Sequence, residues 1–188
     1  RMIFVAAHGD LFHESVPDEW IDRVFAVMAL AQQHTFQVLT KRPDRAARYL
    51  NSLYAGQRGV ASSGLEIRGS LTAPMLVKNA IFDGFKNVWL GTSASDQASA
   101  DLRIPQLLDC PAAVRFVSAE PLLGPLILSR LKFSGGAEID ALRGRDLETG
   151  RLGPALDLVI AGGESGRGAR PMHPDWARSL RDQCVASG

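Results

Sequence analysis

The sequence predicts an α/β fold: a partial (βα) TIM-like barrel of about five parallel strands with flanking helices. Short apolar runs alternate along the chain with segments of helical periodicity, the order that gives a parallel sheet covered by helices. Each run stops at polar residues, as buried strands do where they open into ligand-facing loops. No dinucleotide-binding or phosphate-loop glycine pattern follows the first strand, which favours a curved barrel over a flat sheet.

Composition describes one ordinary globular domain, or a large part of one. The 188 residues are 46% hydrophobic and 22% charged with a net charge of +1, so no global field favours nucleic acid or an anionic membrane. The sequence has no apolar run of the roughly 20 residues that span a membrane, and no signal-peptide order at its start. Cys110 and Cys184 lack metal-ligand or redox spacing, which indicates two buried thiols in a reducing cytoplasm. We therefore expect a cytoplasmic protein.

The chain begins inside a predicted strand, Met2–Ala7, and ends at Ser187-Gly188 directly after a predicted helix. A domain seldom begins so abruptly, so we expect a central fragment with two open sheet edges. Unpaired strand edges expose backbone donors and acceptors. Marginal stability and self-association are the expected consequences.

The first part of the chain predicts two strands, Met2–Ala7 and Thr35–Thr40, and two helices that start at Pro17 and near Pro43. The apolar faces of these helices have helical spacing: Ile21, Val24, Phe25 and Met28 in the first, and Ala46, Leu50 and Leu53 in the second.

Residues 56–73 contain several Gly and Ser and predict an irregular insertion. A short helix over Met75–Phe82 and a third strand over Asn87–Thr92 follow. The segment Ser93–Asp96 resembles a capping box. The helix after it is expected to bury Leu102 and to be interrupted or kinked near Pro105.

The fourth and fifth strands are predicted at Ala113–Glu120 and Leu158–Ala161. Between them, residues 126–156 predict a second irregular insertion, with a hairpin and a short helix around Ala137–Leu142. The last helix starts at Pro174, with Ala177, Leu180 and Cys184 on one face.

Polar residues follow the carboxyl end of every predicted strand, and in parallel α/β folds these ends share one edge where sites are built. We therefore expect one basin that gathers these groups. The candidate catalytic residues are Lys41, Arg42 and Glu120. The candidate cofactor-binding residues are Asp10, Thr92, Ser93, Ser118, Glu120, Gly162, Gly163, Glu164 and Arg170.

Several of these groups allow two interpretations. His8 and Asp10, with His13 nearby, suit a metal pair or a general base with its orienting partner, or the capping of the next helix. Lys41 and Arg42 suit recognition of a carboxylate or phosphate, or are simply solvated charges.

Glu120 ends a mostly apolar strand, where an unpaired carboxylate would be costly to bury. It either pairs with Lys41, Arg42 or Arg170 or binds a ligand amine or ribose. The four glycines of residues 162–168 permit close backbone approach and an anion nest, or form a tight turn. Glu164 among them suggests a hydrogen bond to a cationic or hydroxylated ligand group.

Six phrases of the chain resemble a phage- and prophage-associated bacterial family of unknown function with a radical-SAM-like barrel, and the resemblance extends over nearly the whole chain except the two insertions. They are Asp10-Leu-Phe-His13, Asp18-Glu-Trp-Ile21, His34-Thr-Phe-Gln-Val-Leu-Thr-Lys-Arg-Pro43, Asn87-Val-Trp-Leu-Gly-Thr-Ser93, Arg115-Phe-Val-Ser-Ala-Glu-Pro-Leu-Leu-Gly-Pro125 and Gly162-Gly-Glu-Ser-Gly-Arg-Gly-Ala-Arg-Pro171.

The resemblance implies an upstream loop of three cysteines that holds a [4Fe–4S] cluster, which binds S-adenosylmethionine and generates a 5′-deoxyadenosyl radical. This sequence contains neither that triplet nor the aromatic-Lys-Gln-Trp segment that follows the last helix in the family. The implied fragment cannot ligate the cluster and is expected to be inactive. The resemblance does not carry the methionine-binding role of an early Gly-Gly-Glu triplet to Glu164, because this phrase follows the last strand.

Three functions follow from these patterns. The leading hypothesis is the core of a radical S-adenosylmethionine enzyme of unknown substrate, with Lys41, Arg42, Ser118 and Glu120 in its cofactor and substrate pocket. The second is a barrel enzyme or hydrolase that uses His8 and Asp10 as base or metal ligands and the glycine loop for phosphate. The third is a non-catalytic binding module.

Overall fold

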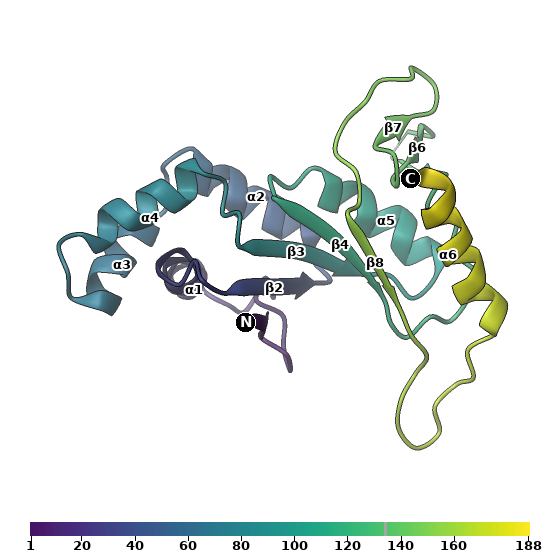
Figure 1. The fold of residues 1–188 in the computed structure, drawn as a ribbon, viewed down its shortest axis with the longest axis horizontal. Coiled ribbons are helices and arrows are strands. Elements are labelled where there is room, and N and C mark those ends of the chain that lie inside the picture. Colours follow the sequence, from purple (N-terminus) through teal and green to yellow (C-terminus); the bar gives the residue numbers. More distant parts are fainter. Residues whose placement is uncertain (134) are drawn as a thin grey trace. The chain divides into compact units, whose positions relative to one another are not determined.

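The computed structural model describes residues 1–133 and 135–188 (Figure 1). Five strands form one parallel sheet in the order β1-β2-β3-β4-β8, which confirms the predicted α/β class. In the described residues β1 and β8 are the end strands of that order, so no closed barrel is found. The strand bounds are β1 Met2–Val5, β2 Thr35–Thr40, β3 Val88–Ser93, β4 Val114–Ala119 and β8 Leu158–Ala161.

The chain divides into two compact units, each with its own internal packing. The first comprises Arg1–Leu90 with Cys110–Val114, and the second comprises Gly91–Asp109 with Arg115–Gly188. The helices of the first unit are α1 Asp18–Leu30, α2 Pro43–Tyr54, α3 Val60–Arg68 and α4 Ala73–Phe82, and those of the second are α5 Gln97–Leu108 and α6 Pro174–Ser187.

In the first unit, the predicted apolar faces are the buried ones. Ile21, Phe25 and Met28 of α1 are almost fully buried, as are the expected residues of α2, whereas Val24 of α1 is half-buried. Helices α1, α3 and α4 contact one another, and β1 pairs with β2 in the register Met2 opposite Thr35. The edge strand β1 leaves Met2, Ile3 and Phe4 exposed by 59%, 37% and 45%.

The expectation of an irregular segment over residues 56–73 is wrong, because α3 lies within it. Gly64 explains why the sequence pattern does not predict this helix. A side chain there would meet Val77 of α4 at 2.7 Å, so the glycine allows α3 and α4 to approach closely. Tertiary packing stabilises this helix despite its weak intrinsic propensity.

A buried carboxylate also fixes the start of α3. Asp22 of α1 accepts hydrogen bonds from Tyr49 Oη at 2.8 Å, Arg58 Nε at 3.1 Å and the Gly59 N–H at 3.2 Å. Burial and the bond to Asp22 raise the pKa of Tyr49, so the phenol remains a donor. The network connects α1, α2 and the residues before α3, which supports the otherwise weak helix.

In the second unit, α5 differs from expectation in three ways. Its capping box is formed by Asp96 and Ser99, one turn later than the predicted Ser93–Asp96. The helix continues through Pro105 without interruption to Leu108. Leu102 is 61% exposed, because the buried stripe of α5 runs through Ala100, Ile104, Leu107 and Leu108.

Residues 126–156 are more regular than predicted. They contain the small antiparallel sheet β5 Leu131–Lys132, β6 Glu138–Asp140 and β7 Arg145–Asp146. The predicted short helix at Ala137–Leu142 is wrong, since β6 occupies its centre and pairs with both neighbours. Helix α6 contacts β8 and buries Leu180, with Ala177 and Cys184 half-buried beside it, as its periodicity predicts.

None of the helices in the described part of the chain has both the length and the apolar character required to cross a bilayer.

Candidate functional site

The carboxylate of Asp10 organises the candidate residues of the first unit. Asp10 Oδ1 accepts hydrogen bonds from Thr40 Oγ1 at 2.7 Å and the Phe12 N–H at 2.9 Å. Its Oδ2 accepts from the Lys41 N–H at 2.9 Å and from Arg42 Nη1 at 3.1 Å. Asp10 therefore ties the loop after β1 to the carboxyl end of β2, and a ligand bound there would have to share an occupied carboxylate.

The pKa of Asp10 reflects these four hydrogen bonds. Burial raises the pKa of Asp10, but the hydrogen bonds from Lys41, Thr40, Phe12 and Arg42 outweigh burial and hold that pKa below its ordinary value. Arg42 is engaged by Asp10 and lies 3.6 Å from Glu14. Within the described residues no contact of the Lys41 ammonium is found, and Lys41 is exposed. Lys41 is thus the cation of this cluster that is available to an anionic ligand.

Of the alternatives for His8 and Asp10, the general base with an orienting partner is not formed, since no hydrogen bond or ion pair joins the two residues in the described part of the chain. His8 is exposed, whereas His13 Nδ1 lies 2.8 Å from Ser15 Oγ. Helix α1 has no side-chain cap, so His8, Asp10 and His13 do not cap the helix that follows. The described residues contain no group of three or more His, Cys, Asp or Glu that could hold a metal ion.

In the second unit, Ser118, Glu120 and Gly162 lie together at the carboxyl ends of β4 and β8. Ser118 Oγ donates to Glu120 Oε2 at 3.2 Å. The Gly162 N–H donates to the Ala119 carbonyl, and the Leu122 N–H donates to the Gly162 carbonyl at 2.8 Å. The other carboxylate oxygen, Glu120 Oε1, lies directly against the Gly162 backbone, where a β-carbon would overlap it.

The premise that Glu120 is buried is wrong. Strand β4 ends at Ala119, and Glu120 is exposed while Ser118 beside it is only 6% exposed. An exposed carboxylate has no large desolvation cost, so it needs no cationic partner. The side chain of Glu120 is held by one hydroxyl and remains accessible, which suits it to bind an ammonium or hydroxyl group.

Two further candidates at the end of β3 are less accessible. Thr92 is fully buried and Ser93 is 7% exposed. The Ser93 carbonyl accepts a hydrogen bond from Arg103 Nη1 at 2.9 Å, which anchors α5 to the strand end. Within the second unit these two residues contribute to packing at the strand end, and neither presents a side chain to solvent.

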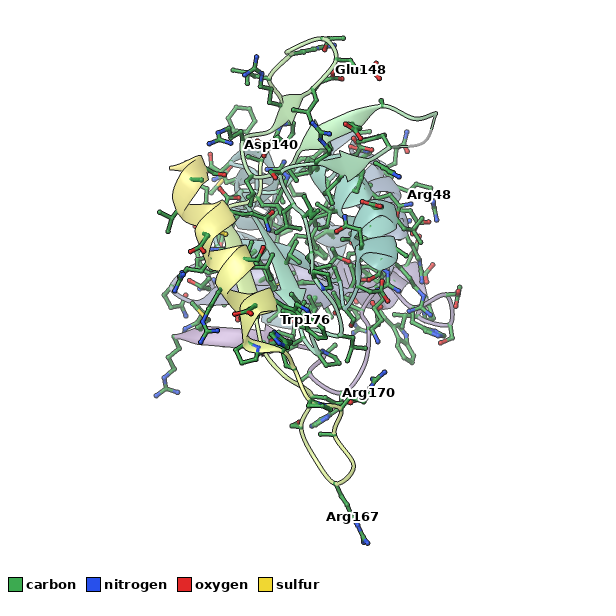
Figure 2. The ribbon with its side chains drawn as sticks, turned by 90° about the vertical axis from the view of Figure 1, so that its right-hand side faces the viewer. Arg48, Asp140, Glu148, Arg167, Arg170 and Trp176 are labelled. Carbon is green, nitrogen blue, oxygen red and sulfur yellow. The ribbon has the colours of Figure 1, made fainter. Side chains whose placement is uncertain are left out.

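The glycine-rich loop after β8 is closed by an ion pair. Glu164 Oε2 accepts from Arg170 Nε at 2.7 Å and from the Arg170 N–H at 2.8 Å, and Oε1 accepts from Nη2 at 2.8 Å. These bonds hold the pKa of Glu164 at about 2. Figure 2 shows Arg170 near the base of this loop and Arg167 at its tip, pointing away. Gly163 is exposed beside the pair.

Comparison with known proteins gives a family. The whole chain, residues 1–188, matches the profile described as "Protein of unknown function (DUF5131)". The chain belongs to the DUF5131 family. Searches of curated proteins and of solved structures found no significant match.

The cysteines of this DUF5131 chain do not fit a [4Fe–4S] cluster, which requires three thiolates from one site. Cys110 belongs to the first unit, is fully buried and donates to the Pro43 carbonyl at 3.5 Å. Cys184 belongs to the second unit, where burial raises the pKa of its thiol.

Each unit of the DUF5131 chain thus gathers part of the predicted set: Asp10, Lys41 and Arg42 in the first, and Ser118, Glu120 and Gly162 in the second. Glu164 and Arg170 pair with each other. The sequence interpretation overlooked Thr40, whose hydroxyl completes the Asp10 cluster. Its position as the polar last residue of a predicted strand was the available signal.

Proposed function

We propose that this chain forms part of a radical-SAM-like, S-adenosylmethionine-binding enzyme in which Ser118, Glu120 and Gly162 hold the amino or ribose hydroxyl groups of the cofactor. The observation that carries the proposal is the exposed Glu120 carboxylate, oriented by Ser118 and lying against Gly162. A carboxylate accepts charge-assisted hydrogen bonds from both kinds of group. A glycine beside it lets the ligand approach the backbone closely.

The sequence phrases that resemble the radical-SAM-like family support the choice of cofactor, and the polar carboxyl ends of a parallel sheet support the place of the site. Bound S-adenosylmethionine would supply a sulfonium, and its reductive cleavage to a radical would require one electron from a [4Fe–4S] cluster, which the two cysteines of this chain cannot hold. The residues of this chain would orient it: Ser118 by fixing the Glu120 rotamer, and Glu120 by accepting the cofactor's donors.

Lys41 is the proposed substrate-contacting residue of the first unit. Its ammonium is exposed, while Arg42 is held by Asp10 and Glu14. An exposed lysine on a fixed backbone binds a carboxylate or phosphate as a point charge. The proposal therefore includes a substrate with an anionic group, positioned by Lys41, with Asp10 as the positioning residue beneath it.

The alternative of a phosphate site at the glycine loop receives less support. Glu164 places a carboxylate inside this loop, and Arg170 already neutralises it. An entering phosphate would have to break a bidentate pair and meet the charge of Glu164.

Calorimetric titration of the chain with S-adenosylmethionine, S-adenosylhomocysteine and inorganic phosphate tests the proposal. Saturable binding of S-adenosylmethionine is expected, and Glu120→Gln should weaken it by about tenfold or more, as loss of a hydrogen bond to a charged group does. Glu148→Gln is the matched control, because Glu148 is an exposed glutamate in the loop after β7 (Figure 2).

Absence of saturable binding, or equal binding by Glu120→Gln and the wild type, would contradict the proposal. Binding of phosphate alone would favour the alternative. Ser118→Ala should weaken binding less than Glu120→Gln, since the carboxylate remains and only its orientation is lost.

A further inference from the structure

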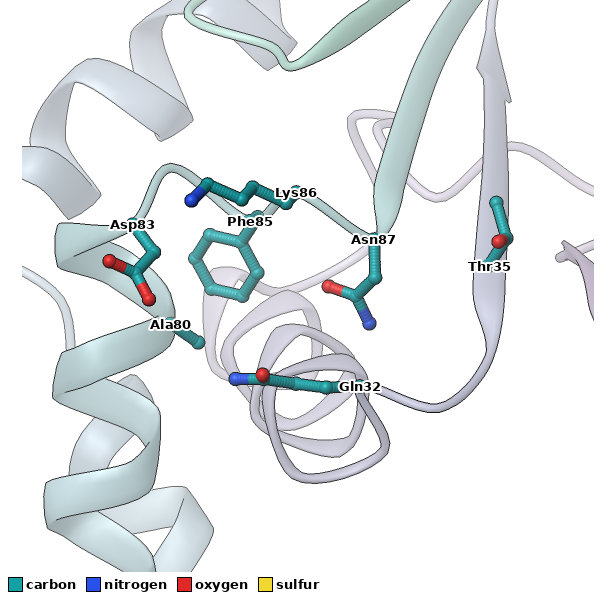
Figure 3. Close-up of a pocket in the computed structure, with 7 residues that line it drawn as sticks. All are labelled: Gln32, Thr35, Ala80, Asp83, Phe85, Lys86 and Asn87. Carbon is teal, nitrogen blue, oxygen red and sulfur yellow. The ribbon is translucent and has the colours of Figure 1, made fainter.

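A cavity of about 310 Å³ lies in the first unit at the amino ends of β2 and β3 (Figure 3). It is separate from the Asp10 cluster, because Thr35 begins β2 and Lys41 follows its last residue. Six residues of extended chain separate the two places by roughly 20 Å. Its volume is at the small end of the range for ligand sites, which suits a compact molecule.

The rim of the cavity combines opposite charges with amides. Gln32, Thr35, Asp83, Lys86 and Asn87 contribute the polar groups, and the buried Phe85 forms an apolar wall. Figure 3 shows the charged ends of Lys86 and Asp83 on the same side of the Phe85 ring. Asp83 and Lys86 are both exposed at this rim, and in the described residues neither charged group has an ion pair or hydrogen bond.

The Asn87 amide is fixed in one orientation. Its Nδ2 donates to the Met28 carbonyl at 2.9 Å and to the His34 carbonyl at 3.3 Å. Both donor directions are thereby used, and Figure 3 shows the oxygen turned toward the Phe85 side of the cavity. Asn87 thus presents an oriented acceptor. The amide of Gln32, which ends toward Ala80 in Figure 3, supplies both a donor and an acceptor to the same cavity.

The backbone that carries Asp83, Phe85 and Lys86 is also fixed. The Phe85 N–H donates to the Ala80 carbonyl at 2.9 Å, and the Val88 N–H donates to the Phe85 carbonyl at 2.8 Å. Gly84 and Phe85 both have positive φ, at 75° and 46°. Phe85 is held in a conformation that non-glycine residues rarely adopt, so the turn between α4 and β3 is tightly determined by its surroundings.

We propose that this cavity binds a small zwitterion of the α-amino-acid class, with its carboxylate at Lys86, its ammonium at Asp83 and its side chain near Gln32 and Asn87. A simple anion would be repelled by Asp83 and a simple cation by Lys86, whereas a zwitterion satisfies both charges. A site that pairs both charges of one ligand discriminates strongly against analogues that lack either group.

Saturation-transfer NMR with glycine, L-serine and L-glutamine at up to about 10 mM tests the site. At least one of them should give saturable transfer, while N-acetyl-glutamine amide, which lacks both charges, should not. Lys86→Met and Asp83→Asn should each weaken binding about tenfold or more, because each leaves one ligand charge unpaired.

Lys78→Met and Glu19→Gln are matched controls, since both residues are exposed in the first unit and outside the cavity lining. Ala80→Leu, which extends a buried wall of the cavity, should abolish binding without a change of charge. A thermal melt confirms that each variant is folded. Failure of all three amino acids to bind, or binding that survives both Lys86→Met and Asp83→Asn, would overturn the proposal.

Discussion

The backbone of Gly162 lies directly against the Glu120 carboxylate, and a β-carbon at position 162 would occupy the space of Glu120 Oε1. Gly162→Ala should therefore displace the carboxylate without straining the backbone, because the φ of Gly162 is not in the left-handed region. We expect S-adenosylmethionine affinity to fall about tenfold or more, with the global fold retained. Calorimetric titration and circular dichroism measure the two properties.

Gly163→Ala separates this effect from a general loss of loop flexibility. A β-carbon at Gly163 would meet Met172 Cβ at 3.5 Å, an ordinary van der Waals contact. Affinity should therefore be unchanged in Gly163→Ala. Equal losses in the two variants would show that the position of Glu120 is not what matters.

Asp10 is expected to stabilise the first unit by accepting bonds from four donors, among them the buried Thr40 hydroxyl. Asp10→Asn removes the charge and places an NH2 group opposite the donors that the carboxylate now accepts from. The free energy of unfolding, measured in urea, should therefore fall by about 1–3 kcal/mol. Glu14→Gln is the control, because the Glu14 side chain is 77% exposed.

The pH dependence of this loss has a definite sign. The folded-state pKa of Asp10 is depressed, so its contribution is fully present above its unfolded pKa of about 3.9 and is lost as the pH falls further. The difference between the wild type and Asp10→Asn should shrink below about pH 4. A difference that stays constant into this acid range would contradict the charged role of Asp10.

Much of the fold could be predicted because local patterns and tertiary packing agree. Strand β2 has the predicted bounds Thr35–Thr40, and α6 begins at the predicted Pro174. Helix α3 could not be predicted, because a glycine such as Gly64 usually indicates the end of a helix. In the structure Gly64 instead leaves space for the side chain of Val77. The prediction that Leu102 is buried was wrong for a related reason. The buried face of α5 is marked by the small residue Ala100, which does not stand out as apolar in the sequence.

The candidate site divides in the same manner. The residue types at the strand ends were visible in the sequence, and Asp10, Lys41 and Arg42 do lie together in the first unit. The sequence could not predict which of these charged groups form ion pairs with one another. The Asp10–Arg42 and Glu164–Arg170 pairs depend on side-chain geometry, since each arginine could have met another carboxylate.

Gly91 should be intolerant of any side chain for a different reason from Gly162. A β-carbon there would lie 2.5 Å from the ring of Phe116, which is only 1% exposed and therefore cannot move into solvent. Gly91→Ala should cost about 1–3 kcal/mol in urea unfolding, the range for overpacking a core. Gly124→Ala, with nothing within 4 Å of the added carbon, should change stability by less than about 0.5 kcal/mol.

A double substitution shows whether the ring is the cause. Phe116→Leu removes the atoms in conflict, so Gly91→Ala should cost less in that background than alone. Additive losses in the double variant would contradict the steric explanation.

The edge strand β1 is expected to promote self-association. Met2, Ile3 and Phe4 expose apolar surface along a strand whose outer backbone groups are not paired in the described sheet. For the wild type, the apparent mass measured by light scattering should rise with protein concentration. In Phe4→Lys this rise should be smaller, since a charge on an edge strand opposes pairing between chains. Leu71→Lys is the control, because Leu71 is 89% exposed and lies outside every strand. A wild-type chain that is monomeric throughout would contradict this expectation.

The Glu164–Arg170 pair should close the glycine loop over most of the pH range. Arg170 holds the pKa of Glu164 at about 2, below its ordinary 4.5, so closure is present above pH 4.5 and is lost as the pH falls toward 2. A carboxyl-carbon NMR titration should give that midpoint, and Arg170→Gln should return it toward 4.5. Arg167→Gln changes a neighbouring exposed charge that makes no contact with Glu164 among the described residues, so it should leave the midpoint near 2. If the two variants moved the midpoint equally, the net charge of the loop would be responsible, and the bidentate geometry would have no special effect.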